Sequence, residues 1–159
     1  MEAALTAADP ANAAGYRANA VTLRERLGEL DARLETRMTP LRERGGYIVF
    51  HDAFGHFETR YGLTSAGALL DASAHGHEHG ASARRMTRLR ELIRAEAESI
   101  ACVFVEPAFD PAQAEALVEG SDTPIVLLDP LGASVPAGAD AYFTLLEDVA
   151  ASFEACLDG

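Results

Sequence analysis

Basic side chains are scarce in this sequence, which has 13 lysine and arginine residues against 25 aspartate and glutamate residues and a formal net charge of -12. Such a surface repels a phosphate backbone, and no basic stripe interrupts it, so we do not expect a nucleic-acid partner. The same charge attracts cations, but many soluble proteins are equally acidic. The charge therefore permits a metal-binding function without predicting one.

Long apolar runs and a rich supply of cysteine are also lacking. No stretch approaches the roughly 18 consecutive apolar residues of a spanning helix, and residues 1–15 lack the basic and apolar regions of a signal peptide. With 159 residues and 48% hydrophobic content, the chain can bury one core, and we expect one soluble domain in a mature or truncated form. Cys102 and Cys156 are compatible with one disulfide and equally with two buried thiols.

Helical and strand patterns are both present. Apolar residues recur at steps of four and three between residues 16 and 38, which predicts one long amphipathic helix that Pro40 ends. Three short apolar runs predict strands at residues 47–50, 100–105 and 125–128. Helical patterns separate these runs and follow the last one. This order predicts an α/β fold with a parallel sheet flanked by helices.

Polar side chains follow each predicted strand. His51 and Asp52 come after the first, Glu106 after the second and Asp129 after the third. Because ligands of open parallel sheets bind at the carboxyl ends of the strands, we expect these side chains at one edge. Imidazole with oxygen ligands suits Zn²⁺, Mn²⁺ or Fe²⁺. In a structural alternative the two aspartates cap turns and Glu106 forms a salt bridge. A zinc site built on a single histidine would be incomplete.

Two further interpretations concern the histidines. His51 with Asp52 or Glu106 could serve as the acid/base pair of a small α/β enzyme, but no Ser or Cys nucleophile lies in a strand-to-helix elbow beside them and no phosphate-binding glycine motif is present. His75, His77 and His79 alternate with other residues in a segment rich in Gly and Ala. Such a composition binds metal without a preformed geometry, and a solvated polar loop is the alternative.

The sequence resembles the zinc solute-binding proteins of bacterial ABC importers, the ZnuA type of cluster A-I. Three motifs carry the resemblance in order: H-D-A-F-G-H-F-E at residues 51–58, C-V-F-V-E-P-A-F at residues 102–109 and L-D-P-L-G at residues 128–132. Members have two α/β lobes joined by a long helix, with the metal in the cleft. The resemblance implies an N-terminal lead-in at residues 1–15, part of the linker helix at residues 16–40 and the C-terminal lobe at residues 41–159.

The resemblance also implies a function and a ligand set. Intact members capture zinc in the periplasm and deliver it to an ABC permease without catalysis. His51 matches a zinc ligand, Asp129 matches a candidate fourth ligand, and Glu106 matches a residue that supports the ligands. Two further histidine ligands belong to the other lobe. Asp52, the carboxylate next to His51, is expected to orient the imidazole by the general rule for ligating histidines. An imidazole in place of the carboxylate of manganese members favours zinc over manganese or iron, which remain the alternative.

Two more expectations follow from the resemblance. Cys102 and Cys156 match a disulfide of the family, which places the chain in an oxidising periplasm. The segment containing His75, His77 and His79 has no counterpart at this place in the family, so any accessory role in metal binding is specific to this sequence. The sequence leaves open whether an isolated lobe self-associates; an apolar face that the other lobe would cover would favour such a contact, which need not be physiological.

Overall fold

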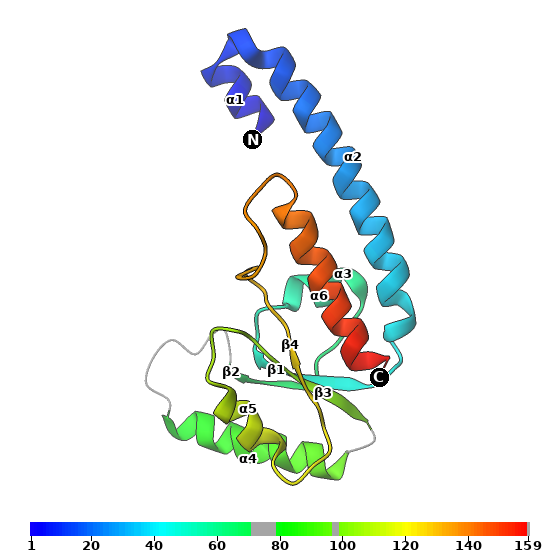
Figure 1. Ribbon diagram of the computed structural model, residues 1–159, viewed down its shortest axis with the longest axis vertical. Helices are drawn as coiled ribbons and strands as arrows, with labels where there is room; N and C mark the ends of the chain where they lie inside the picture. Colours follow the sequence, from blue (N-terminus) through cyan, green and yellow to red (C-terminus); the bar gives the residue numbers. More distant parts are fainter. Residues whose placement is uncertain (71–78, 97–98, 159) are drawn as a thin grey trace. The chain divides into compact units, whose positions relative to one another are not determined.

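The computed structural model describes residues 1–70, 79–96 and 99–158, and the chain divides into two units, Met1–Glu35 and Thr36–Gly159. In the first unit, helix α1 (Glu2–Ala8) and a short 3-10 helix (Pro10–Asn12) precede helix α2 (Ala13–Met38), which continues into the second unit (Figure 1). Asp9 lies at the turn, and its carboxylate accepts hydrogen bonds from Asn12 Nδ2 at 2.7 Å and from the Tyr16 hydroxyl at 2.9 Å. The long helix predicted from residue 16 to residue 38 is thus confirmed and begins at Ala13.

The second unit is an α/β structure with a four-stranded parallel sheet in the order β2-β1-β3-β4. Its elements are β1 (Gly46–His51), α3 (Gly55–Tyr61), β2 (Gly67–Leu70), α4 (His79–Ala95), β3 (Ile100–Val105), α5 (Pro111–Val118), β4 (Ile125–Leu127) and α6 (Ala141–Leu157). The predicted α/β class and the three predicted strands are confirmed. The sequence analysis missed β2, because Gly67 and Ala68 give its first half little strand propensity.

The strand order creates a topological switch point. From β1 the chain crosses to β2 on one side, and after α4 it returns to β3 on the other side of β1. The connections from β1 and from β3 therefore leave in opposite directions. In doubly wound sheets the crevice between two such strands, at their carboxyl ends, is the usual ligand site. The residues that end β1 and follow β3 are His51 and Glu106.

Helices cover both faces of the sheet, with α3 and α6 on one face and α4 and α5 on the other (Figure 1). On the α6 face, the ring of Phe153 packs against Tyr47 and Phe104 with centroid distances of 5.2 and 4.9 Å. The opposite face forms an aliphatic core with Ile48, Phe50, Leu69, Leu89, Ile93, Ile100, Val103, Val105, Ala114 and Leu117. Because both faces are buried, β1 and β3 consist of continuous apolar residues, as their sequences predicted.

The entry to β1 requires a glycine. Gly45 has a φ of 127°, and a Cβ atom there would lie 3.0 Å from the carbonyl oxygen of Ser99. The next residue, Gly46, donates its backbone N–H to that same oxygen at 2.7 Å. Only a residue without a side chain fits this conformation and this close approach. Gly45 therefore aligns the start of β1 with β3, and the register of β1 sets where His51 emerges.

Candidate metal site

His51 is the last residue of β1, and Glu106 directly follows β3, so the parallel pairing of these strands places both residues at the switch point. His51 Nδ1 lies 3.4 Å from Glu106 Oε1. The His51 side chain is 35% exposed and the Glu106 side chain is 8% exposed. The prediction that these two side chains meet at one sheet edge is confirmed by this contact. The imidazole thus has one ring nitrogen facing a buried carboxylate while part of the ring reaches solvent.

The Glu106 carboxylate is poorly satisfied. Its Oε1 atom is buried and makes no hydrogen bond within the described part of the chain. Burial raises the pKa of the Glu106 carboxyl; the charge of His51 opposes this rise, and the negative charge of Asp129 adds to it. A buried carboxylate oxygen without a hydrogen bond is costly, and such groups concentrate at functional sites. Because its charge contributes to the raised pKa of Glu106, the Asp129 carboxylate lies near His51 and Glu106.

A tight turn of residues 106–109 follows β3 and places Phe109 beside the His51 ring. The Phe109 N–H donates to the Glu106 carbonyl at 3.1 Å, which closes a turn with Pro107 at its second position. Proline is favoured there because its ring fixes φ near the value that the turn needs. The Phe109 ring lies 5.9 Å from the His51 ring and 4.8 Å from the Phe50 ring. The sequence analysis quoted this segment but assigned no role to Phe109.

Asp129 lies in a loop after β4 that binds its carboxylate through the backbone. Asp129 Oδ1 accepts the N–H groups of Leu131 and Gly132, both at 2.9 Å, and Oδ2 accepts that of Ala133 at 2.6 Å. These are the hydrogen bonds expected of an aspartate that caps a turn, the structural alternative given for Asp129. An ionised carboxylate offers about four lone-pair positions, so the described residues leave about one of them unused. A turn-capping role and a metal-ligand role for Asp129 are therefore compatible.

The remaining predicted site residues are Asp52 and the histidines at positions 75, 77 and 79. The Asp52 side chain is exposed, and its charge contributes to raising the pKa of Glu58, after the larger effect of burial. His75 and His77 lie outside the described residues; His79 begins α4, but its side chain is not among those described. Within the described ranges, no three His, Cys, Asp or Glu side chains are arranged to hold a metal ion.

The disulfide between Cys102 and Cys156 is present, with the two Cα atoms 5.6 Å apart and 54 residues apart in the sequence. It joins β3 to α6, and both cysteines are buried. The predicted pairing is confirmed. A loop of this length stabilises the folded state by about 4 kcal/mol in the chain-entropy description. Strand β3, which directly precedes Glu106, is therefore covalently tied to α6, the helix covering it.

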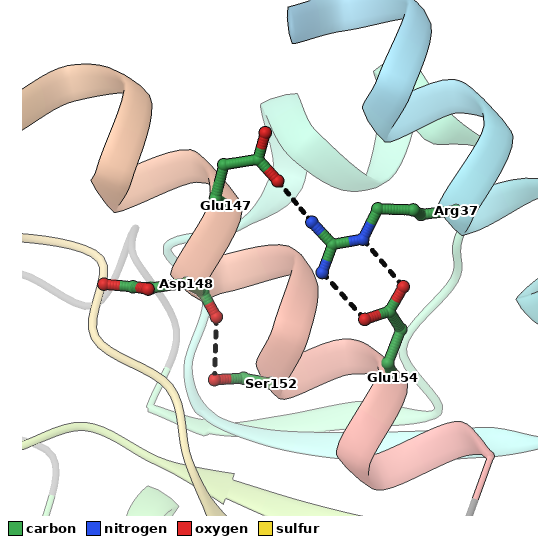
Figure 2. A network of polar contacts seen from close by, with 5 residues as sticks. All are labelled: Arg37, Glu147, Asp148, Ser152 and Glu154. Carbon is green, nitrogen blue, oxygen red and sulfur yellow. Dashed lines mark hydrogen bonds and ion pairs between the residues drawn. The ribbon is translucent and has the colours of Figure 1, made fainter. Parts of the chain in front are cut away.

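A polar network that the sequence analysis missed joins the end of α2 to α6. Arg37 donates from Nε to Glu154 Oε1 at 2.8 Å and from Nη2 to Glu154 Oε2 at 2.7 Å, and its Nη1 contacts Glu147. Figure 2 shows the guanidinium between the two carboxylates. The hydrogen bond from Arg37 lowers the pKa of Glu154. We call these three residues the Arg37 network. Glu147 and Glu154 are seven positions apart, which places them on one face of α6.

Comparison with solved structures shows the class of fold. The crystal structure of a ZnuA aligns with a TM-score of 0.77 and 26% identity over 98% of this chain and 53% of its own chain. The periplasmic zinc-binding protein TroA of Treponema pallidum aligns with a TM-score of 0.80, at 23% identity, over 98% of this chain and 57% of its own. The fold is therefore that of an α/β unit found in metal solute-binding proteins.

Sequence comparison gives the family. A family model described as "Zinc-uptake complex component A periplasmic" matches residues 1–156. High-affinity zinc uptake system proteins ZnuA of Brucella abortus and Paracoccus denitrificans are 34% and 36% identical over 149 and 152 residues, each covering 94% of this chain. The chain belongs to the family of zinc-uptake components of the ZnuA type. It spans 42% and 44% of the lengths of those two relatives.

Among the helices of the described residues, none has both the length and the apolar content that crossing a bilayer needs.

Proposed function

We propose that this chain is one lobe of a zinc-binding protein that captures Zn²⁺ for a zinc-uptake system, and that His51 is its zinc ligand. The observation that carries the proposal is the 3.4 Å approach of His51 Nδ1 to the buried Glu106 Oε1. Histidines that bind metal usually donate their second ring N–H to a carboxylate, which fixes the tautomer and makes the ligating nitrogen more basic. Nδ1–H facing Glu106 leaves Nε2 as the ligand atom.

The buried carboxylate fits this role. Zinc at Nε2 would draw electron density from the imidazole and make Nδ1–H a stronger donor, and Glu106 Oε1 has no other hydrogen bond in the described residues to compete with it. Asp129 has an open lone-pair position at the same edge, and we propose it as the fourth ligand. The remaining ligands would come from the part of the relatives' length that this chain does not span.

The family membership supports the biological role. The chain would act without catalysis, and the assembled protein would deliver Zn²⁺ to the membrane permease of an ABC importer. The family description and the disulfide are both compatible with the oxidising periplasm. Zinc is preferred over manganese or iron because the ligand that this lobe offers is an imidazole. The histidines at positions 75, 77 and 79 are proposed as an accessory, weaker zinc site.

Zinc titration by calorimetry tests the proposal. The chain has five histidines, so replacing His75, His77 and His79 together by Ala leaves His51 and His56. We expect this triple variant to retain one weak zinc site, to lose it with His51→Ala and to keep it with His56→Ala. Equal losses with both single replacements would overturn the assignment of His51.

The same titrations test the half-site and the metal. Tight, stoichiometric binding by the 159-residue chain that disappears with His51→Ala would overturn the proposal that ligands are missing from it. Competition between Zn²⁺ and Mn²⁺ in the triple variant tests the choice of metal. We expect zinc to displace manganese, and the reverse order would favour the manganese or iron alternative.

A further inference from the structure

We infer that Phe109 is a positioning residue that selects the ring orientation and tautomer of His51, an inference that rests on the proposed role of His51 as a ligand. The turn of residues 106–109 contains two side chains that approach the imidazole. Glu106, the first residue of the turn, faces Nδ1, and Phe109, the fourth residue, lies against the ring. A single turn thus supplies both the carboxylate that faces Nδ1 and the aromatic ring that lies against the imidazole.

The turn itself is held rigidly. The Phe109 N–H bond to the Glu106 carbonyl closes it, and Pro107 restricts its second residue. The Phe109 ring also packs against the Phe50 ring, at a centroid distance of 4.8 Å and an interplanar angle of 42°. Phe50 is 1% exposed and belongs to the aliphatic core on the sheet face that α4 and α5 cover. The position of Phe109 is therefore set by the core and not by solvent.

The Phe109 ring lies where it restricts rotation of the imidazole. Its centroid is 5.9 Å from that of His51, with the planes inclined at 59°, within the usual range of aromatic contacts. Turning the imidazole over about its Cβ–Cγ bond exchanges the ring edges and moves Nδ1 away from Glu106. A neighbouring ring at this distance disfavours the rotation because side chains in packed surroundings have few open rotamers. Phe109 therefore helps keep Nδ1–H on Glu106 and Nε2 free for zinc.

The test observes the imidazole directly in the metal-free chain. In the variant lacking His75, His77 and His79, ¹H–¹⁵N spectra at pH 8 report which nitrogen of His51 is protonated. We expect Nδ1–H in this parent, a mixture of tautomers in Phe109→Leu, and the parent pattern in Phe109→Tyr, which keeps the ring. Phe57→Leu is the matched control, because Phe57 is also partly buried and stacks on Phe153 at 5.3 Å on the other face of the sheet.

Zinc titration followed at the same His51 signals gives the second result. Phe109→Leu should weaken binding at His51 about tenfold, the low end of the effect of losing a group that orients a metal ligand. Phe109→Tyr and Phe57→Leu should bind as the parent does. An unchanged tautomer in Phe109→Leu, or an equal change in Phe57→Leu, overturns the inference. If the tautomer changes as expected but zinc never perturbs His51, the positioning role stands and the proposed zinc function fails.

Discussion

Two clusters in the second unit each place a glutamate carboxylate beside a nitrogen-containing side chain, but the two carboxylates differ in hydrogen bonding and in the direction of their pKa shifts. In the Arg37 network, Glu154 receives two hydrogen bonds from one guanidinium and its pKa is lowered. In the His51–Glu106 pair, the contact is 3.4 Å long, Glu106 Oε1 has no hydrogen bond in the described residues, and burial raises the pKa of the carboxyl. The first arrangement is complete in the folded chain, whereas the second leaves one buried carboxylate oxygen unsatisfied within the described residues.

The difference separates a structural cluster from a candidate functional one. Natural proteins satisfy their buried polar groups, and departures from this rule concentrate where a ligand will complete the arrangement. The Arg37 network joins two helices and needs nothing further. Glu106, in contrast, has a buried oxygen without a hydrogen bond in the described residues, and a charged or metal-bound imidazole at His51 would compensate its charge. The comparison predicts that removing the two carboxylates has opposite consequences for stability.

The largest expected effect comes from the disulfide that supports α6, the helix carrying both glutamates of the Arg37 network. Replacing Cys102 and Cys156 by Ala should lower the free energy of unfolding by about 4 kcal/mol, because the unfolded chain regains its loop entropy. Urea unfolding of the variant and of the oxidised parent measures the loss. An unchanged unfolding midpoint would mean that the Arg37 network and the aromatic core hold α6 without the covalent tie.

Removing the guanidinium from the Arg37 network is expected to have the next largest effect. Arg37→Met should destabilise the chain by about 2 kcal/mol, between the values for exposed and for buried pairs, since Glu154 and Glu147 lose a shared partner. The matched control is Arg24→Met, whose partner Glu2 is reached across an exposed pair at 3.1 Å. That variant should change stability by less than about 0.5 kcal/mol. Equal losses in the two variants would contradict the structural role of the Arg37 network.

Replacing Glu106 should leave the stability of the chain unchanged or raise it, in contrast to the two replacements above, which lower it. Glu106→Gln removes a buried charge whose Oε1 atom has no hydrogen bond in the described residues, so at pH 7 we expect unchanged stability or a gain of about 1 kcal/mol, together with weaker zinc binding at His51. Glu154→Gln, which breaks a satisfied pair, should instead cost about 1–2 kcal/mol. Thermal unfolding in the absence of metal measures both. A clear destabilisation by Glu106→Gln would mean that the His51–Glu106 contact is a structural salt bridge.

The residue patterns allowed the fold class, the long helix and the meeting of His51 with Glu106 to be predicted, and the family resemblance added the disulfide. Strand periodicity located β1 and β3, and the rule for parallel sheets placed the residues after them together. Two features escaped. The four-residue strand β2 has too few strand-forming residues to be recognised, and the Arg37 network joins positions separated by 110 and 117 residues. Such long-range pairs are decided by helix packing, which local patterns do not contain.

The role of Phe109 was hidden for a related reason. An aromatic residue after E-P-x predicts burial, and burial alone does not say which ring it meets. Its position against His51 follows from the turn that Pro107 favours together with the alignment of β1 beside β3, which Gly45 secures. Each of these parts was visible in the sequence. Their combination requires the strand register, which depends on the whole sheet.

The smallest expected effect is a difference in pH dependence between the two clusters. Because Arg37 lowers the pKa of Glu154 below its ordinary value of 4.5, the stabilisation by this pair is fully present above pH 4.5 and is lost as the pH falls through the lowered pKa. The stability difference between the parent and Arg37→Met should therefore be constant from pH 8 to about pH 5 and shrink below pH 4.5. Urea unfolding across this range measures it, with Arg24→Met as the reference. A difference that stays constant down to pH 3 would show that Arg37 stabilises the chain by the packing of its aliphatic stem and not by its charge.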